Sequence, residues 1–117
     1  MARVLIVDDD DSQRLLNRTI MQKSGHEIFL ARSGEEALKV CLRKAIDIVL
    51  TDLEMTGGDG FELIQAIAGL TPPITIIALS GKGPAMLEKA RELGAEVTLS
   101  KPITPKTLLA AVESVAG

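Results

Sequence analysis

The chain has 117 residues, of which 46% are hydrophobic and 25% charged, and its formal net charge is −3. This length accommodates one domain with a real core, and the composition excludes an intrinsically disordered chain. The acidic balance argues against nucleic acid as a partner, and two aromatic residues are too few for a base-stacking surface. A single cysteine excludes an internal disulfide, and no apolar run is long enough to span a bilayer, so we expect a cytoplasmic protein.

Short apolar runs alternate with helical patterns along the whole chain. The apolar runs predict five strands, at residues 4–7, 28–31, 48–50, 74–79 and 97–99. A helical pattern follows each run, and the apolar faces are predicted, in chain order, to be Leu15, Leu16 and Ile20; Ala37, Leu38, Cys41 and Leu42; Phe61, Ile64 and Ile67; Met86, Leu87, Ala90 and Leu93; and Leu108, Val112 and Val115.

Capping residues predict where the helices begin. Ser33 followed three residues later by Glu36 is a capping-box pattern. The other expected caps are Asp11 or Ser12, Asp59, and Thr104 ahead of a proline.

The predicted strands are continuous apolar runs and do not alternate with polar residues. Such runs are typical of a parallel sheet whose two faces are both covered by helices. The order of elements therefore predicts an α/β fold of the doubly wound (βα)₅ type. We expect residues 1–117 to form one domain.

Reactive side chains follow four of the five predicted strands. Asp8 and Asp9 end the first, Asp52 the third, Ser80 the fourth and Lys101 the fifth. In a parallel sheet these ends share one edge, where open α/β sheets bind ligands. Carboxylates gathered there repel each other unless a cation neutralises them, and hard oxygen ligands suit Mg²⁺ or Mn²⁺. With such a cation and Lys101 beside it, Asp52 can accept a phosphoryl group, and Ser80 can bind a phosphoryl oxygen.

These motifs occur in the order of a known family. Val7-Asp8-Asp9, then Asp52-Leu53-Glu54-Met55 running to Asp59-Gly60, then Ala78-Leu79-Ser80-Gly81 and Lys101-Pro102 resemble a two-component response-regulator receiver domain. The resemblance covers the whole chain. It implies a flavodoxin-like fold with strand order 2-1-3-4-5, and a switch that changes partner binding when phosphorylated and is not a turnover enzyme.

The resemblance also implies roles for individual residues. Asp52 would receive the phosphoryl group from the phosphohistidine of a histidine kinase or a histidine phosphotransfer protein. Asp9 would bind the metal directly, Asp8 through water, and Glu54 through its backbone carbonyl, with Asp52 as a further ligand. The Lys101-Pro102 bond is expected to be cis.

The chain departs from the family pattern at the expected output face. A downstream protein is expected to bind the face formed by the fourth helix, the fifth strand and the last helix. Thr98 stands where receivers usually carry an aromatic switch residue, so we expect a muted signal there, or one carried by residues 81–83. Thr56 replaces a usual proline, which predicts a looser loop, and Glu54 is expected to pair with Lys82.

Three alternatives use the same residues differently. A haloacid-dehalogenase-like phosphatase would take its nucleophile from Asp8–Asp11 and leave Asp52 unexplained. A flavodoxin-type flavin carrier is disfavoured by the absence of Trp and Tyr. A degenerate receiver would bind partners without being phosphorylated, and the complete acid set argues against it.

Overall fold

The computed structural model describes residues 1–55 and 60–116. Strands and helices alternate along the chain as β1 (Arg3–Val7), α1 (Asp11–Gln22), β2 (Glu27–Ala31), α2 (Gly34–Arg43), β3 (Ile48–Asp52), α3 (Gly60–Ile67), β4 (Thr75–Ser80), α4 (Pro84–Leu93), β5 (Val97–Ser100) and α5 (Pro105–Ala116). The five strands predicted from the sequence are confirmed, with ends that differ by one or two residues.

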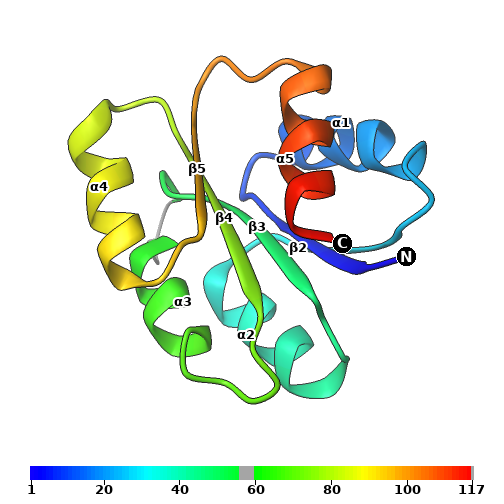
Figure 1. Cartoon of the computed structure of the whole chain (residues 1–117), viewed down its shortest axis with the longest axis horizontal. Coiled ribbons are helices and arrows are strands. Elements are labelled where there is room, and N and C mark those ends of the chain that lie inside the picture. The colour runs from blue at the N-terminus through cyan, green and yellow to red at the C-terminus, as the bar shows by residue number, and fades with distance from the viewer. Residues whose placement is uncertain (56–59, 117) are drawn as a thin grey trace.

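The strands form one parallel sheet in the order β2-β1-β3-β4-β5, which confirms the predicted doubly wound topology (Figure 1). The chain reverses its direction of winding between β1 and β3, which are direct neighbours. Val7 pairs with Thr51 across this boundary, so the residues that follow both strands are brought together. This switch point is the place where a ligand is expected in such a sheet.

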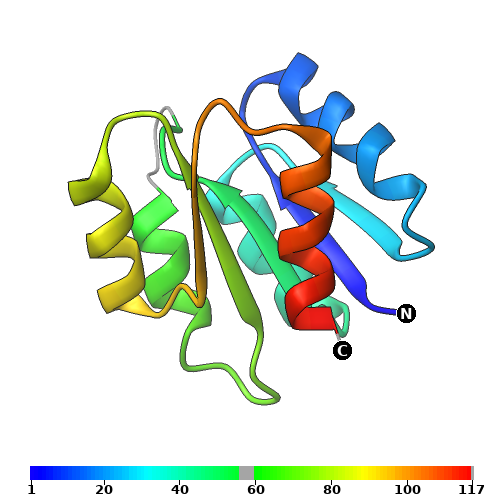
Figure 2. The ribbon, with the colours of Figure 1, turned by 45° about the horizontal axis from the view of Figure 1, so that its top comes forward.

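Helices cover both faces of the sheet, with α1 and α5 on one face and α2, α3 and α4 on the other (Figures 1 and 2). Successive residues of a strand point to opposite faces. In β1, Val4 and Ile6 join the core beneath α1 and α5, whereas Leu5 and Val7 join the core beneath the other three helices. Because both faces of the sheet are covered, the central strands β1, β3 and β4 carry unbroken apolar runs, at residues 4–7, 48–50 and 76–79.

The caps of three helices can be compared with the prediction. Ser33 Oγ accepts a hydrogen bond from Glu36 N at 3.1 Å, and Thr104 Oγ1 accepts one from Thr107 N at 3.1 Å, which confirms both caps. The prediction for the first helix was wrong: its N-cap is Asp10, whose side chain accepts from the backbone N of Gln13. Thr56 and the expected cap Asp59 lie outside the described residues.

Two predicted helix faces were partly wrong. Leu15, Leu16 and Leu42 are 44%, 52% and 64% exposed. The residues of α1 that are buried are Arg14 and Met21. The inner face of α1 therefore carries a buried arginine, while two of the leucines predicted for that face are exposed.

The two ends of the chain lie near each other, at the amino edge of the sheet (Figures 1 and 2). Met1 and Ala2 line one small pocket together with Val115 and Ala116. His26 strengthens this region, because its Nδ1 accepts a hydrogen bond from Ala2 N at 2.9 Å and its Nε2 lies 2.8 Å from Glu113 Oε1. None of the helices in the described part of the chain is long and apolar enough to cross a membrane.

Candidate functional site

The carboxyl edge of the sheet buries three polar side chains. Asp8 follows β1 and is 4% exposed, while Asp52 and Ser80 end β3 and β4 and are 5% and 1% exposed. Lys101 follows β5 and reaches across the edge, so that its Nζ donates a hydrogen bond to Asp52 Oδ2 at 2.9 Å. Asp9 follows Asp8 and is exposed. Residues far apart in the chain thus meet where the strand pattern predicted.

Asp52 is fixed by the main chain around it. Its Oδ1 accepts a hydrogen bond from Glu54 N at 3.0 Å, and the β3–β4 ladder continues past it through a bond from Leu53 N to Leu79 O at 2.9 Å. Behind it, the first residue of α3 is Gly60, where an added Cβ would lie 2.7 Å from the carbonyl oxygen of Asp52. The end of β3 and the start of α3 are therefore in backbone contact.

Asp8 is held in the same way at the end of β1. Its backbone N donates to Ala31 O at 3.1 Å, and its Oδ1 accepts from Asp10 N at 2.9 Å. Burial raises the pKa of Asp8; the hydrogen bond from Asp10 opposes this rise, and the charge of Asp52 adds to it. The two buried carboxyl groups thus repel each other, as predicted for acids gathered at one edge.

Lys101 is the cation on the open side of this acid cluster. Partial burial by itself lowers the pKa of its ammonium group, but the hydrogen bond to Asp52 and the charges of Asp52, Glu54 and Asp8 outweigh burial and raise it. Lys101 is therefore charged at neutral pH. The Lys101-Pro102 bond that precedes the loop to α5 is cis, as expected.

Ser80 and Glu54 both accept hydrogen bonds from the loop after β4. Ser80 Oγ accepts a hydrogen bond from Lys82 N at 3.1 Å, and Glu54 Oε1 accepts one from Gly81 N at 2.8 Å. The prediction that Glu54 pairs with the Lys82 side chain was wrong, since the carboxylate binds the loop through its main chain. Glu54 Oε2 is buried and has no hydrogen-bond partner among the described residues.

The donor chemistry of the edge fits a hard divalent cation. It offers carboxylate oxygens, including a buried Glu54 oxygen that has no hydrogen-bond partner among the described residues. The charged form of Asp8 is disfavoured first by burial and also by the charge of Asp52. Within residues 1–55 and 60–116, no three His, Cys, Asp or Glu side chains converge as a ready-made metal cage. This arrangement suits Mg²⁺, which usually takes one or two carboxylates and keeps several waters.

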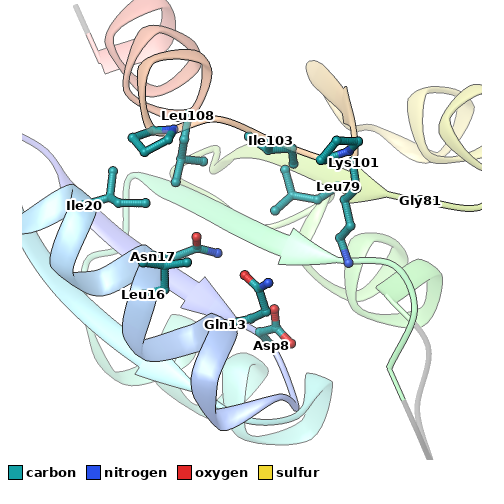
Figure 3. Close-up of a pocket in the computed structure, with 12 residues that line it drawn as sticks. Asp8, Gln13, Leu16, Asn17, Ile20, Leu79, Gly81, Lys101, Ile103 and Leu108 are labelled. Atoms are coloured by element: carbon teal, nitrogen blue, oxygen red, sulfur yellow. The ribbon is translucent and has the colours of Figure 1, made fainter.

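A groove of about 530 Å³ opens beside the acid cluster, between α1 and the segment that leads into α5. Figure 3 shows its two ends: Asp8, Gln13 and Lys101 lie toward the sheet edge, whereas Ile20 and Leu108 lie at the far end. The exposed Leu16 of α1 lines the same groove. The site therefore continues into a surface with a polar and an apolar end.

Known protein families include one whose members resemble this chain along most of its length. A family model described as "Response regulator receiver domain" matches residues 4–113. The chain belongs to the response regulator receiver domain family. This finding confirms the resemblance seen in the sequence motifs.

Several relatives of this receiver are similar over most of their length. It is 32% identical over 101 residues to sporulation initiation phosphotransferase F of Bacillus subtilis, covering 86% of this chain and 82% of that protein. It is 35% identical over 121 residues to a probable chemotaxis protein CheY of Rhizobium etli, covering 98% and 92%. Among solved structures, the chemotaxis response regulator CheY4 of Vibrio cholerae superposes with a TM-score of 0.90 at 31% identity, covering 98% of each chain.

Family membership establishes the class of function. The receiver is a phosphorylation-dependent switch of two-component signalling, and receivers are signalling modules, not turnover enzymes. The family uses Mg²⁺ at its phosphorylation site and is phosphorylated by histidine kinases or phosphotransfer proteins. The phosphatase and flavin-carrier alternatives are thereby set aside.

Two residues at this edge were not anticipated from the sequence. Asp10 both caps α1 and donates its backbone N–H to Asp8. Arg14 was not singled out, although it is buried and hydrogen-bonded to the same loop. The signal available was the spacing of Arg14 three residues after Asp11, which places the two on one face of a helix.

Proposed function

We propose that Asp52 is the phosphoacceptor of this receiver and that Lys101 and Ser80 act on the phosphoryl group it accepts. The observation that carries the proposal is the 2.9 Å contact between Lys101 Nζ and Asp52 Oδ2, made by a buried carboxylate at the switch point of the sheet. A carboxylate in this position is a nucleophile held next to the cation that its product needs.

The metal ligands we propose are Asp8, Asp9, Asp52 and the backbone carbonyl of Glu54, acting on Mg²⁺ or Mn²⁺. When bound, the ion supplies positive charge that offsets the negative charge of the transferred phosphoryl oxygens. Support comes from the repulsion between Asp8 and Asp52, which a cation placed between them would relieve. The exposed position of Asp9 beside Asp8 leaves it accessible from the mouth of the site.

In the transfer step, an oxygen of Asp52 attacks the phosphorus of a phosphohistidine. The new O–P bond forms as the N–P bond breaks, and the electron pair of that bond stays on the imidazole nitrogen of the donor. Lys101, already charged and in place, attracts the phosphoryl oxygens by its ammonium group. The hydroxyl of Ser80 can donate to one of these oxygens, since the hydrogen bond it makes with Lys82 uses the hydroxyl oxygen as acceptor.

We propose two kinds of partner, each binding a different surface of the molecule. A histidine kinase or phosphotransfer protein must bring its histidine to Asp52, and the groove along α1 is the neighbouring surface that such a protein would cover. The downstream partner would bind the face formed by α4, β5 and α5, where Arg91 and Glu92 are exposed. Residues 1–117 would act as one receiver unit in both encounters.

The proposal is tested by incubation with acetyl phosphate and Mg²⁺, followed by intact-mass measurement. We expect the wild type to gain one phosphoryl group, and Asp52→Asn to gain none because an amide is not a nucleophile toward phosphorus. Asp47→Asn is the matched control, because Asp47 lies just before the opposite end of the same strand and binds Arg3 N.

Three outcomes would count against the proposal. A wild type that never gains mass would make this chain a degenerate receiver. A gain that persists in Asp52→Asn would move the acceptor to another residue. A gain that is unchanged when the metal is removed with EDTA would contradict the role given to the cation.

A further inference from the structure

Arg14 is a buried cation beneath the acidic loop that joins β1 to α1. Its side chain is 8% exposed, and it lies in the first turns of α1. Among the described residues, the charged side chains that are buried are Asp8, Asp52 and Arg14, so that Arg14 is the cation that shares the interior with the two acids. Burying an arginine is costly unless its donors are all used, which directs attention to its partners.

The guanidinium group binds both ends of the loop. Nη1 donates to the backbone carbonyl of Asp8 at 2.9 Å, a hydrogen bond that is itself buried, and Nη2 donates to Asp11 Oδ1 at 2.5 Å. Asp11 is 78% exposed, and the hydrogen bond from Arg14 followed by its charge lowers the pKa of Asp11. The planar fork of an arginine can make both bonds at once, whereas a lysine ammonium is a single point.

These contacts sort four consecutive acids into different tasks. Asp10 caps α1 and donates its backbone N–H to Asp8, and Asp11 pairs with Arg14. Of the other two acids, Asp8 lines the groove at the site and Asp9 is exposed beside it. The Arg14 side chain therefore holds this loop from its buried side, through hydrogen bonds to Asp8 and Asp11.

We propose that Arg14 is a positioning residue for the metal site: it holds the Asp8–Asp11 loop in the conformation that presents Asp8 and Asp9 to the divalent cation. The inference rests on the proposed function, since it assumes that these two acids bind the ion. It assigns to Arg14 no contact with the phosphoryl group or with the ion itself. Groups that orient metal ligands in this way are often worth about 10- to 100-fold in metal affinity.

Positioning and simple electrostatics make opposite predictions. If Arg14 acted only as a nearby positive charge, it would repel the cation, and its removal would tighten metal binding. If it fixes the loop, its removal weakens metal binding despite the loss of that repulsion. The sign of the change therefore separates the two roles.

The experiment measures the Mg²⁺ dissociation constant of the full chain by titration, followed through backbone amide shifts by NMR. We expect Arg14→Met to weaken binding by about 10- to 100-fold, and Arg14→Lys, which keeps the charge but loses the fork, to weaken it by about tenfold. Arg18→Lys is the matched control, because Arg18 lies one turn further along α1 and its buried Nε has no partner among the described residues. It should leave the dissociation constant unchanged.

A second measurement needs no metal. Asp10 N donates to Asp8 within the loop, so its amide hydrogen exchange reports whether the loop is held. We expect faster exchange at Asp10 in metal-free Arg14→Lys and in Asp11→Ala, which removes one of the two anchors without touching Arg14. These two variants keep the test decisive if Arg14→Met fails to fold.

The outcomes distinguish the inference from the function on which it rests. Unchanged or tighter Mg²⁺ binding in the Arg14 variants, with wild-type exchange at Asp10, would overturn the inference alone. A wild type that does not bind Mg²⁺ would overturn both the metal site and the role of Arg14 in it. A weaker affinity in Arg18→Lys equal to that of Arg14→Lys would also overturn the inference, because the effect would then be general to α1.

Discussion

The carboxyl edge of the sheet and the corner between α4 and β5 are built in contrasting ways. At the edge, Asp8 and Asp52 are buried, the carboxylate of each accepts a hydrogen bond from a main-chain N–H, and Asp52 also binds Lys101. At the corner, an exposed hydrogen bond of 2.7 Å from Arg91 Nη2 to Thr98 Oγ1 joins the helix to the strand. The acids of the candidate site are thus held by buried contacts. The hydrogen bond at the corner, on the expected output surface, is exposed, and its loss should change the free energy of unfolding little.

The largest effect is expected behind Asp52. Gly60→Ala would place a Cβ 2.7 Å from the carbonyl oxygen of Asp52 and 2.9 Å from Leu53 Cα, and neither backbone atom can move without shifting β3. We expect a loss of about 3 kcal/mol in the free energy of unfolding, the upper range for overpacking. Urea denaturation measures it, with the midpoint and slope fitted separately.

Gly81→Ala is the matched control for this prediction. A Cβ at Gly81 would lie 3.5 Å from Lys101 Cβ, which is an ordinary van der Waals contact, and no positive φ is involved. Its free energy of unfolding should change by less than about 0.5 kcal/mol. Equal losses in the two variants would contradict the view that the end of β3 is the tightly constrained point.

A smaller effect of opposite sign is expected at Asp8. Its pKa in the folded protein is raised above the ordinary value of 3.8, so the folded state holds this proton more tightly than the unfolded state. The stability that this proton provides is complete below 3.8 and is lost as the pH rises through the raised value. The Asn side chain in Asp8→Asn does not ionise, so this variant does not lose stability as the pH rises. Its amide oxygen can still accept the hydrogen bond from Asp10 N.

We therefore expect Asp8→Asn to be more stable than the wild type at neutral pH. A rise in Tm of about 3 to 5 °C corresponds to roughly 1 kcal/mol in a domain of this size. Thermal unfolding monitored by circular dichroism should show the difference shrinking as the pH is lowered toward 3.8. A variant less stable than the wild type at neutral pH would mean that burial and the charge of Asp52 do not penalise the ionised form of Asp8.

The smallest effect is expected at the corner. Thr98→Val removes the acceptor of Arg91 from an exposed hydrogen bond, and the free energy of unfolding should change by less than about 0.5 kcal/mol. With beryllofluoride as a phosphoryl mimic, NMR shifts should be larger at Gly81, Lys82 and Gly83 than on α4 and β5, and this pattern should persist in Thr98→Val. Shifts confined to α4 and β5 would show that the corner carries the signal without an aromatic residue.

The sequence predicted the elements of the fold well because the central strands β1, β3 and β4 are buried on both faces. Runs such as Val4–Val7 and Ile76–Leu79 are apolar at every position, which leaves few competing readings. The meeting of Asp52 with Lys101 followed from parallel topology, whereas the strand order came from the resemblance to receiver domains. Four residues far apart in the chain could be assigned to one site because each stands at the end of a strand or directly after it: Asp8, Asp52, Ser80 and Lys101.

The sequence did not predict which side of α1 faces the core. A helical pattern in Leu15, Leu16 and Ile20 favours an apolar stripe, but the buried residues of α1 are Met21 and Arg14, and Arg14 binds the acidic loop. Four adjacent acids likewise left the cap of α1 open, because each can accept a helical N–H and only the three-dimensional loop decides among them. Such details depend on contacts between side chains and main chain that periodicity does not record.

The neighbouring ends of the chain have a practical consequence for work on this protein. Residues 2 and 116 border the same small pocket at the amino edge of the sheet, whereas Asp52 ends β3 at the carboxyl edge. An affinity tag, a fluorophore or a surface tether attached at either terminus will therefore sit on the side of the molecule remote from the acid cluster. Immobilised in this way, the protein should present its reactive edge to solution, ready for partners added in flow.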